Sequence, residues 1–447
     1  MKYVEGSKKV FMETGTKFPD KMIWSVALIK RCAAQTNVSL GLLEPRIGEA
    51  IINASEEVMR GEHNDKVLVD VFQTGSGTGI NMNLNELIAE RASEMSGLSI
   101  HPNDHVNMGQ SSNDVVPTAI RVAAVSAVQE DLRQSLRKIV GGLEALAERC
   151  SNVYKAGRTH LRDALPVTMG QEFGAYADAF QHDENLVEAA LSYVKEVPIG
   201  GTAVGTGLNT HPSFGELMVR SINAATGLDF SSAKNKFRAA RLLSDMASLS
   251  SALRILSLDL YRLCQDLRLM FSGPMTGLNE IDIPTQQEVA GSSIMPGKTN
   301  PVTVESAMLV CAQTIGLDQA NQMASLIGEF ELSMGVPLMG YNVVTQIRLM
   351  SEALSKVSDV VLDHVEPNTQ TARRYAESSP ALITVLSPII GYDKASKIGK
   401  ELVKGYSIRE ALAEMGYNEA QINEILNIKK LVEPGIPVKE HEERIEK

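Results

Sequence analysis

Long stretches of the chain carry apolar residues at three- to four-residue spacing, the pattern of a helix with one buried face. Within residues 20–60 and 81–96 this pattern predicts helices of ordinary length. Longer helices are predicted over five further stretches: 119–147, 166–197, 231–271, 302–333 and 340–363. Because these stretches far exceed the average helix of about 11–12 residues, the sequence predicts an all-α fold built on a long helical bundle.

The texture of the chain changes twice. Residues 97–112 are rich in Gly, Pro, Asn and Ser, as loops are, and beyond Pro367 the predicted helices become short. We therefore predict an N-terminal domain over 1–108, a central bundle domain over 109–363 and a small C-terminal domain over 364–447. Since helices of this length leave apolar surface that one bundle cannot hide, we expect the chain to form an oligomer.

Composition and charge exclude several classes of protein. The chain is 44% hydrophobic and 22% charged, which is ordinary for a globular protein and unlike a disordered one. Its 54 acidic residues outnumber 43 basic residues, which argues against a nucleic-acid partner. No apolar run approaches the length of a membrane span, and the N-terminus lacks a signal-peptide pattern. We therefore expect a cytoplasmic protein without a membrane partner. The four cysteines form no CxxC pair and are predicted to be buried, reduced thiols: Cys32, Cys150, Cys264 and Cys311.

Two glycine-rich segments resemble nucleotide-binding loops but fail the tests for them. In QTGSGTGI, Ile80 stands where a dinucleotide fingerprint needs its third glycine. In GSSIMPGKT, Ser292 stands where a phosphate loop needs its first glycine, and Pro296 removes a backbone N–H. The second segment is instead predicted to present hydroxyls, N–H groups and one lysine to a smaller anion.

Five polar clusters stand out between the helices. They are GSGTGINMN (75–83), HPNDH (101–105), GQSSND (109–114), GRTHL (157–161) and GSSIMPGKTNP (291–301). For SSND alone, helix capping is the better interpretation. Together, however, the five clusters favour an anion site, because helix starts carry partial positive charge and free N–H donors.

The HPNDH cluster also invites a metal interpretation. His101, Asp104 and His105 are closely spaced, but Pro102 disfavours a regular helix with two histidines on one face. No further cluster of ligands appears in the sequence, so we predict neither a metal nor a cofactor.

The GSSIMPGKTNP segment resembles the signature loop G-S-S-x-M-P-x-K-x-N of the aspartase/fumarase superfamily. The other clusters resemble that family's remaining blocks in the same order, from Gln73 to Glu305. The class II fumarase pattern fits best. His160 stands where many aspartate ammonia-lyases carry Gln, and Ser112 stands where aspartases usually carry Thr. The segment GGTAVGTGLNTH at 200–211 is similar to the fumarase version.

This resemblance implies an aspartase/fumarase-like fold and a homotetramer in which each active site takes loops from three subunits. It implies a hydro-lyase of the tricarboxylic acid cycle that interconverts fumarate and (S)-malate by anti addition of water, without a cofactor. It also implies that Ser293 removes the proton next to the carboxylate. A serine is a poor base unless its ionised form is stabilised, so nearby N–H groups and Lys298 must lower its pKa. His160, paired with Glu305, would protonate the leaving hydroxyl through a water.

The remaining residues have implied binding roles. Lys298 and Asn300 would stabilise the doubly charged aci-carboxylate. Further substrate contacts are implied for Ser76, Thr78, Ser111, Ser112, Asn113, Thr159 and Ile294. His101, Asn103 and Asp104 match a secondary dicarboxylate site at the entrance. Many family members carry an arginine three residues before this histidine, where this sequence has Leu98, so anion binding there is expected to be weak.

Two alternatives use the same scaffold. An aspartate ammonia-lyase would differ mainly in its contacts to the leaving group. A catalytically silent helical scaffold, similar to the lens relatives of the superfamily, is disfavoured because Ser293, Lys298, Asn300 and His160 are all present.

Overall fold

The computed structural model describes residues 2–435, and helices dominate it. The all-α prediction is confirmed. The chain divides into two compact units whose segments alternate along the sequence. Unit 1 spans the residues up to Arg137, Gln181–Tyr261 and Met308–Leu354. Unit 2 spans Lys138–Phe180, Arg262–Ala307 and the residues from Ser355 onward. The three-domain division of the chain stays a prediction.

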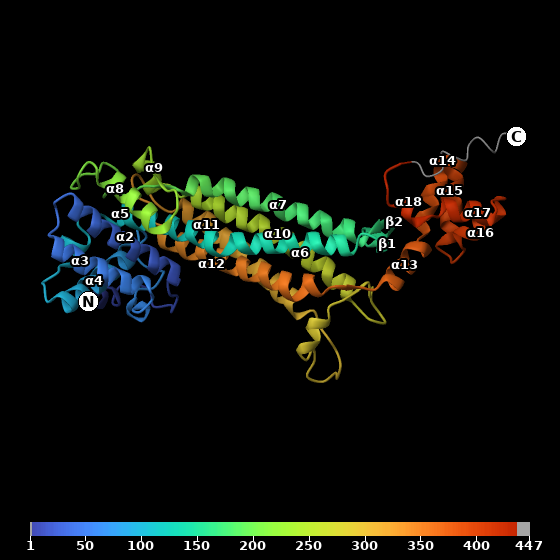
Figure 1. The fold of residues 1–447 in the computed structure, drawn as a ribbon, viewed down its shortest axis with the longest axis horizontal. Coiled ribbons are helices and arrows are strands. Elements are labelled where there is room, and N and C mark those ends of the chain that lie inside the picture. The colour runs from blue at the N-terminus through green and yellow to red at the C-terminus, as the bar shows by residue number, and fades with distance from the viewer. Residues whose placement is uncertain (1, 436–447) are drawn as a thin grey trace. The chain divides into compact units, whose positions relative to one another are not determined.

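The first part of unit 1 is a group of helices that includes those predicted within 20–60 and 81–96 (Figure 1). They are α1 (Lys2–Ser7), α2 (Asp20–Ser39), α3 (Pro45–Met59), η1 (Asn64–Lys66) and α4 (Thr78–Ser96), followed by the π-helical turn η2 (Pro102–Val106). Pro45 opens α3, where a missing N–H has little effect. Helix α2 is buried along most of its length and packs against α3, α5 (Ser112–Ala127) and α8 (Phe214–Thr226).

The predicted helix over 119–147 begins earlier than the pattern indicated. Helix α5 starts at Ser112, continues through a π-helical turn, η3 (Val128–Leu132), and is followed by α6 (Arg133–Arg149). Every residue of α5 from Asp114 to Ala127 is buried. The start of this helix therefore holds the SSND cluster against the body of unit 1.

The prediction of one helix over 231–271 is wrong. The segment contains β4 (Ser231–Ser232), α9 (Lys236–Arg241) and α10 (Ser244–Phe271). Between the last two, Leu242 is extended and its carbonyl accepts a hydrogen bond from Arg121 Nη2 at 3.4 Å. The Arg121 guanidinium is fully buried and paired with Asp245 at 2.7 Å and 3.0 Å. The buried guanidinium needs hydrogen-bond acceptors on several sides, and the Leu242 carbonyl is one of them. This need explains the helix break at Leu242, where the sequence has neither glycine nor proline.

The helix predicted over 166–197 is shorter, because both of its ends lie in strands. Helix α7 covers Met169–Val194. Before it, β1 (Tyr154–Thr159) and β2 (Arg162–Thr168) form an antiparallel hairpin in which Pro166 lies opposite Ala156. After it, β3 (Glu196–Val197) pairs in parallel with β4. Strand pairing therefore prevails over the preference of Pro166 for the first turn of a helix.

The last two long helices are α11 (Val302–Leu326) and α12 (Val336–Lys356). Helix α11 ends before the predicted residue 333, ahead of Gly328, whose φ is 136°. In unit 1, a buried polar network joins α10, α11 and α12, which lie side by side (Figure 1). Its members are Ser250, Asp318, Asn321 and Gln346, linked at 2.7–3.1 Å.

The remaining part of unit 2 consists of short elements, as expected. After η5 (Val357–Val361) and η6 (Leu362–His364) come α13 (Thr369–Ser378), η7 (Pro380–Leu386), α14 (Ser387–Ile390), α15 (Tyr392–Leu402), α16 (Ile408–Glu414), α17 (Glu419–Ile425) and α18 (Ile428–Leu431). Helix α13 contacts β1, while η7 and α18 contact β2. Earlier in unit 2, η4 covers Pro284–Glu288, and β5 (Ile281–Asp282) pairs antiparallel with β6 (Glu366–Pro367). All four cysteines are free and buried, as predicted. Among the described helices, none has the length and apolar content that a membrane crossing needs.

Helices α7 and α10 bring two carboxyl groups together in unit 1. Asp183 on α7 is 2% exposed and shares a hydrogen bond with Asp259 on α10. Its Oδ2 atom has no hydrogen-bond partner among the described residues. Burial first, and then the neighbouring Asp259, raise the pKa of Asp183 to about 7, although His182 opposes this shift. The folded chain therefore holds a proton here that the unfolded chain releases at lower pH.

We expect Asp183→Asn to stabilise the protein at pH 8 more than at pH 5. The folded-state pKa lies above the unfolded value, so the free energy of unfolding of the parent protein falls as pH rises between them. Each pKa unit corresponds to about 1.4 kcal/mol. Thermal unfolding at both pH values measures the difference, with the exposed Asp131→Asn as control. An equal change in Tm at both pH values would contradict the shared proton.

Candidate active site

In unit 1, the starts of α4 and α5 lie close together and carry a chain of hydroxyl groups. Ser76 Oγ lies 2.9 Å from Thr78 Oγ1, which lies 2.8 Å from Ser112 Oγ. Gly77 has a φ of 81°, and a Cβ there would lie 2.6 Å from a methyl carbon of Val116. The glycine therefore allows the two helix starts to approach. Three of the predicted substrate contacts are thus adjacent, beside two helix N-termini that favour an anion.

Ser111 caps α5, as the SSND pattern predicted. Its Oγ accepts the N–H of Asn113 at 3.2 Å, and its own N–H donates to Asp114 Oδ1 at 2.9 Å. Asn113 Nδ2 donates to the carbonyl of Ala203 at 2.8 Å. The SSND residues therefore both cap the helix and belong to the polar group at its start. The 200–211 segment is hydrogen bonded to the same helix start.

Asp114 connects the start of α5 to the 200–211 segment through hydrogen bonds. Its carboxylate is fully buried, and its Oδ2 accepts the N–H groups of Gly200 and Thr202, each at 2.9 Å. Burial raises the pKa of Asp114 to about 6, against the opposing effect of its hydrogen bonds and of Lys30. One side chain thus joins the start of α5 to the loop at residues 200–203.

Lys30 is a buried cation that the sequence analysis missed. Its side chain is fully buried in α2, and its Nζ donates to Asn107 Oδ1 at 2.8 Å and to Gln110 Oε1 at 3.0 Å. Burial lowers its pKa to about 7. The sequence does contain a signal for its burial, because Lys30 lies at helical spacing from Ile23 and Val26 on the buried face of α2.

The predicted entrance residues lie together on the surface of unit 1. His101 Nδ1 accepts the N–H groups of Asn103 at 3.3 Å and Asp104 at 3.1 Å, and so caps η2. The same nitrogen lies 3.2 Å from Asp104 Oδ2, and the two side chains are 53% and 76% exposed. Their role in binding a dicarboxylate stays a prediction.

In unit 2, Thr159 and His160 lie at the tip of the β1–β2 hairpin. His160 and Leu161 form its two-residue turn, with φ angles of 54° and 56°. Both residues adopt the left-handed conformation that type I′ turns require and that non-glycine residues rarely take. Thr159 and His160 are exposed in the chain. The hairpin therefore presents its polar tip outward.

The signature loop, residues 291–301, closes on itself. Asn300 Nδ2 donates to the carbonyl of Gly291 at 2.6 Å, and the N–H of Gly291 donates to the carbonyl of Lys298 at 3.1 Å. Ser292, not Ser293, makes the turn, since its Oγ accepts the N–H groups of residues 294 and 295. Ser293, Ile294 and Lys298 are exposed, and Ile294 reaches 84%.

Two cavities of unit 2 adjoin this hairpin and this loop. A cavity of about 310 Å³ is lined by His160, and one of about 610 Å³ is lined by Lys298, Asn300 and Glu305. The two cavities share Leu161, Arg262, Asp266 and Leu269 as lining residues. Glu305 Oε1 lies 3.8 Å from Arg268 Nε. Among the described residues no hydrogen bond joins His160 to Glu305, so that pairing stays a prediction.

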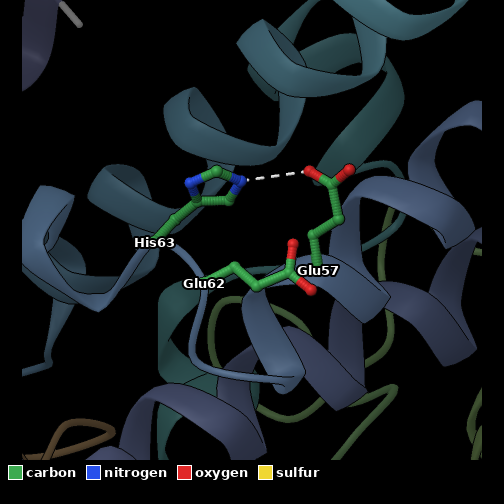
Figure 2. Close-up of side chains that lie close together, drawn as sticks. All are labelled: Glu57, Glu62 and His63. Carbon is green, nitrogen blue, oxygen red and sulfur yellow. Dashed lines mark hydrogen bonds and ion pairs between the residues drawn. The ribbon is translucent and has the colours of Figure 1, made fainter.

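A separate group in unit 1 has the composition of a metal site. Figure 2 shows Glu57, Glu62 and His63, whose ligand atoms lie within 4.8 Å of one another. His63 Nε2 lies 3.0 Å from Glu57, but Arg91 also binds this carboxylate at 2.9 Å and 3.2 Å and lowers its pKa. Arg60 pairs with Glu62 at 2.6 Å. Because two guanidinium groups already neutralise the carboxylates, the arrangement is that of an ion-pair network.

Comparison with known proteins identifies the family. Residues 1–316 match the family model described as lyase, and residues 382–433 match the one described as fumarase C C-terminus. A protein of Saccharolobus solfataricus named fumarate hydratase class II is 61% identical over 439 residues, which cover 98% of this chain and 100% of the relative. The chain belongs to the class II fumarate hydratase family.

Other members of the class II fumarate hydratase family agree. A protein of that name from Corynebacterium glutamicum is 43% identical over 91% of this chain and 86% of its own. The crystal structure of recombinant class II fumarase from Schistosoma mansoni superposes with a TM-score of 0.92 at 33% identity, covering 96% of this chain and 94% of that one. The resemblance found in the five polar clusters is therefore confirmed, as are the aspartase/fumarase-like fold and the prediction of a lyase.

We expect Asp114→Asn to loosen the loop at residues 200–203. The amide offers one oxygen in place of two, so a buried N–H of Gly200, Thr202 or Ser111 loses its acceptor, at about 1–3 kcal/mol. Amide hydrogen exchange at residues 199–203 should become faster and Tm should fall. The exposed Asp104→Asn serves as control and should change the free energy of unfolding by less than about 0.5 kcal/mol. Unchanged exchange in Asp114→Asn would contradict the role given to Asp114.

Proposed function

We propose that the chain is a fumarate hydratase that interconverts fumarate and (S)-malate. The observation that carries this proposal is the 61% identity, over 98% of this chain and the whole of the relative, to a protein named fumarate hydratase class II. The residue choices at His160 and Ser112 support it, because aspartate ammonia-lyases commonly differ there. The substrate is accordingly a small dicarboxylate, the reaction is a hydro-lyase step, and its place is the tricarboxylic acid cycle in the cytoplasm.

The hydroxyl cluster of unit 1 would bind one substrate carboxylate. Thr78 and Ser112 are hydrogen bonded to each other at the starts of α4 and α5, where helix dipoles favour negative charge. Ser76, Ser111 and Asn113 adjoin them. Neutral donors of this kind hold a dicarboxylate without an ion pair too tight for product release. Thr159 and Ile294 would complete the contacts from unit 2.

Ser293 would remove the proton from malate. That C–H bond breaks, its proton goes to the Ser293 oxygen, and its electron pair enters the neighbouring carboxylate to form the aci-carboxylate. Lys298 and Asn300 would stabilise the two negative charges that develop there. The exposed position of Ser293 on a loop closed by other residues leaves its hydroxyl available for this role.

His160 would complete the reaction from the opposite face. As the aci-carboxylate returns its electron pair to form the C=C bond, the C–O bond breaks and the leaving hydroxide takes a proton from His160 through a water. Glu305 would orient the imidazole as its hydrogen-bond partner. In the hydration direction every step runs in reverse.

A homotetramer would bring these groups together. The hydroxyl cluster belongs to unit 1, while Ser293 and His160 belong to unit 2, and we propose that each site takes them from three subunits. Helix α11 supports an oligomer, because Leu309, Met323 and Leu326 on it are 62–74% exposed. A neighbouring subunit packed on this helix would remove these apolar side chains from water. His101, Asn103 and Asp104 would form a secondary dicarboxylate site, weakened by Leu98.

A direct assay tests the activity and the base. Fumarate, (S)-malate and L-aspartate are supplied separately, and absorbance of the C=C bond is followed. We expect fumarate to be consumed and malate to yield fumarate without ammonia, and Ser293→Ala to lower kcat by about 100-fold or more. The exposed Ser192→Ala on α7 is the matched control and should keep full activity. Fumarate release from aspartate alone would instead identify an aspartate ammonia-lyase, and no turnover of any substrate a silent scaffold.

Mixing variant subunits tests the shared site. Ser293→Ala and His160→Asn tetramers are each expected to be nearly inactive. If the two residues of one site come from different subunits, co-refolding equal amounts should restore roughly a quarter of the sites, because each required subunit is intact in half of the cases. If one subunit supplies both residues, no mixed tetramer contains an intact site, and the mixture stays inactive.

A further inference from the structure

Two cations on strand β1 bind one buried carboxylate. Arg158 donates from Nη1 and Nη2 to the two oxygens of Glu280, at 3.0 Å and 2.9 Å. Lys155 Nζ lies 3.0 Å from Glu280 Oε2 and 2.7 Å from Glu172 Oε2. The Glu280 side chain is fully buried and Lys155 is 3% exposed. The fork-shaped pairing of a guanidinium with a carboxylate fixes direction as well as distance.

A β-bulge lies in the hairpin between the positions of the two cations. Here Gly157 of β1 lies opposite two residues of β2, Ala164 and Leu165, so the extra residue of the bulge is on β2. A Cβ on Gly157 would lie 2.6 Å from the carbonyl oxygen of Leu165 on β2. The glycine therefore permits the bulged strand β2 to approach β1 between the two residues that bind Glu280.

Glu280 is itself held in place by its backbone. Its N–H donates to the carbonyl of Met270 in α10, and its carbonyl accepts the N–H of Asn368 next to β6, each at 2.8 Å. The carboxylate is thus an anchor attached to two other elements of unit 2. The hairpin needs such an anchor, because a two-stranded hairpin is marginally stable alone and its turn at His160 and Leu161 is in a strained conformation.

We infer that Glu280 is a positioning residue for His160. It does not touch the reacting atoms: it binds Arg158, two residues before the imidazole, and so sets where the tip of the hairpin points. This inference rests on the proposed role of His160 as the acid of a fumarate hydratase. It assigns to the K-A-G-R-T-H segment a mechanical function, in which Lys155, Gly157 and Arg158 orient the two residues that follow.

Replacing the anchor should weaken the chemical step more than binding. Glu280→Gln leaves a neutral amide against two cations, and small displacements of a catalytic group can reduce rate by about 100-fold. We expect kcat to fall about 10- to 100-fold while KM changes less than about threefold, because most proposed carboxylate contacts lie on other segments. Glu280→Asp keeps the charge on a shorter side chain and should restore part of kcat.

The decisive measurement combines this change with His160→Asn. If Glu280 acts through His160, the double variant should have the same kcat as His160→Asn alone, since the imidazole that Glu280 positions is already gone. Asp318→Asn is the matched control: Asp318 is 2% exposed and paired with Arg254 at 2.9 Å, but it lies in unit 1. It should lower Tm, leave kcat unchanged and combine additively with His160→Asn.

The outcomes separate this inference from the proposed function. The inference would be overturned if Glu280→Gln lowered kcat by the same factor in the parent enzyme and in the His160→Asn variant. It would also be overturned if Glu280→Gln left the kcat of the parent enzyme unchanged. Tetramer content and Tm are checked first, and Glu280→Asp replaces Glu280→Gln if the latter does not fold. A parent enzyme inactive on fumarate would refute the proposed function; the inference would then be decided by amide exchange at residues 156–162, which must become faster in Glu280→Gln and not in Asp318→Asn.

Discussion

A carboxylate removed from water must be met by donors or cations on every side, and this requirement organises the surroundings of the candidate residues in each unit. In unit 1, Asp114 accepts three backbone N–H groups and lies near the buried Lys30. In unit 2, Glu280 accepts from Arg158 and Lys155. An unpaired buried charge is strongly destabilising. The positions of the two carboxylates therefore fix the positions of the loops that supply their hydrogen-bond partners. Residues with proposed roles adjoin these contacts in the sequence: Ser111, Ser112 and Asn113 directly precede Asp114, and His160 lies two residues after Arg158.

Much of the fold is predictable from apolar spacing, because burial of one helix face leaves a regular trace in the sequence. The exceptions have a common cause. The break at Leu242 depends on Arg121, which lies over a hundred residues away, and the strands beside α7 depend on pairing between β1 and β2. The spacing of apolar residues within one segment cannot indicate partners that are distant in the sequence. The polar clusters were found because glycine, serine and asparagine are conspicuous between helices, whereas Lys30 was missed because one lysine hardly alters an apolar stretch.

The same residue types serve different ends in different surroundings. Glu57, Glu62 and His63 have the composition of a metal site, but Arg91 and Arg60 supply the positive charge that an ion would otherwise bring. The hydroxyl cluster of Ser76, Thr78 and Ser112 lies at two helix starts, and no charged side chain is hydrogen bonded to its hydroxyl groups in the described part of the chain. It therefore retains the capacity to bind an anion. Composition alone does not distinguish these cases, whereas the presence of a neutralising neighbour does.

The left-handed turn at residue 160 lowers the stability of the fold at a residue with a proposed catalytic role. A histidine at a φ of 54° stores backbone strain that glycine or asparagine would relieve. Selection for a more robust fold alone would therefore drive the imidazole out of this position. The role proposed for His160 gives a reason for a strained histidine at the hairpin tip, and a thermostable engineered variant of this chain is therefore best sought away from this turn.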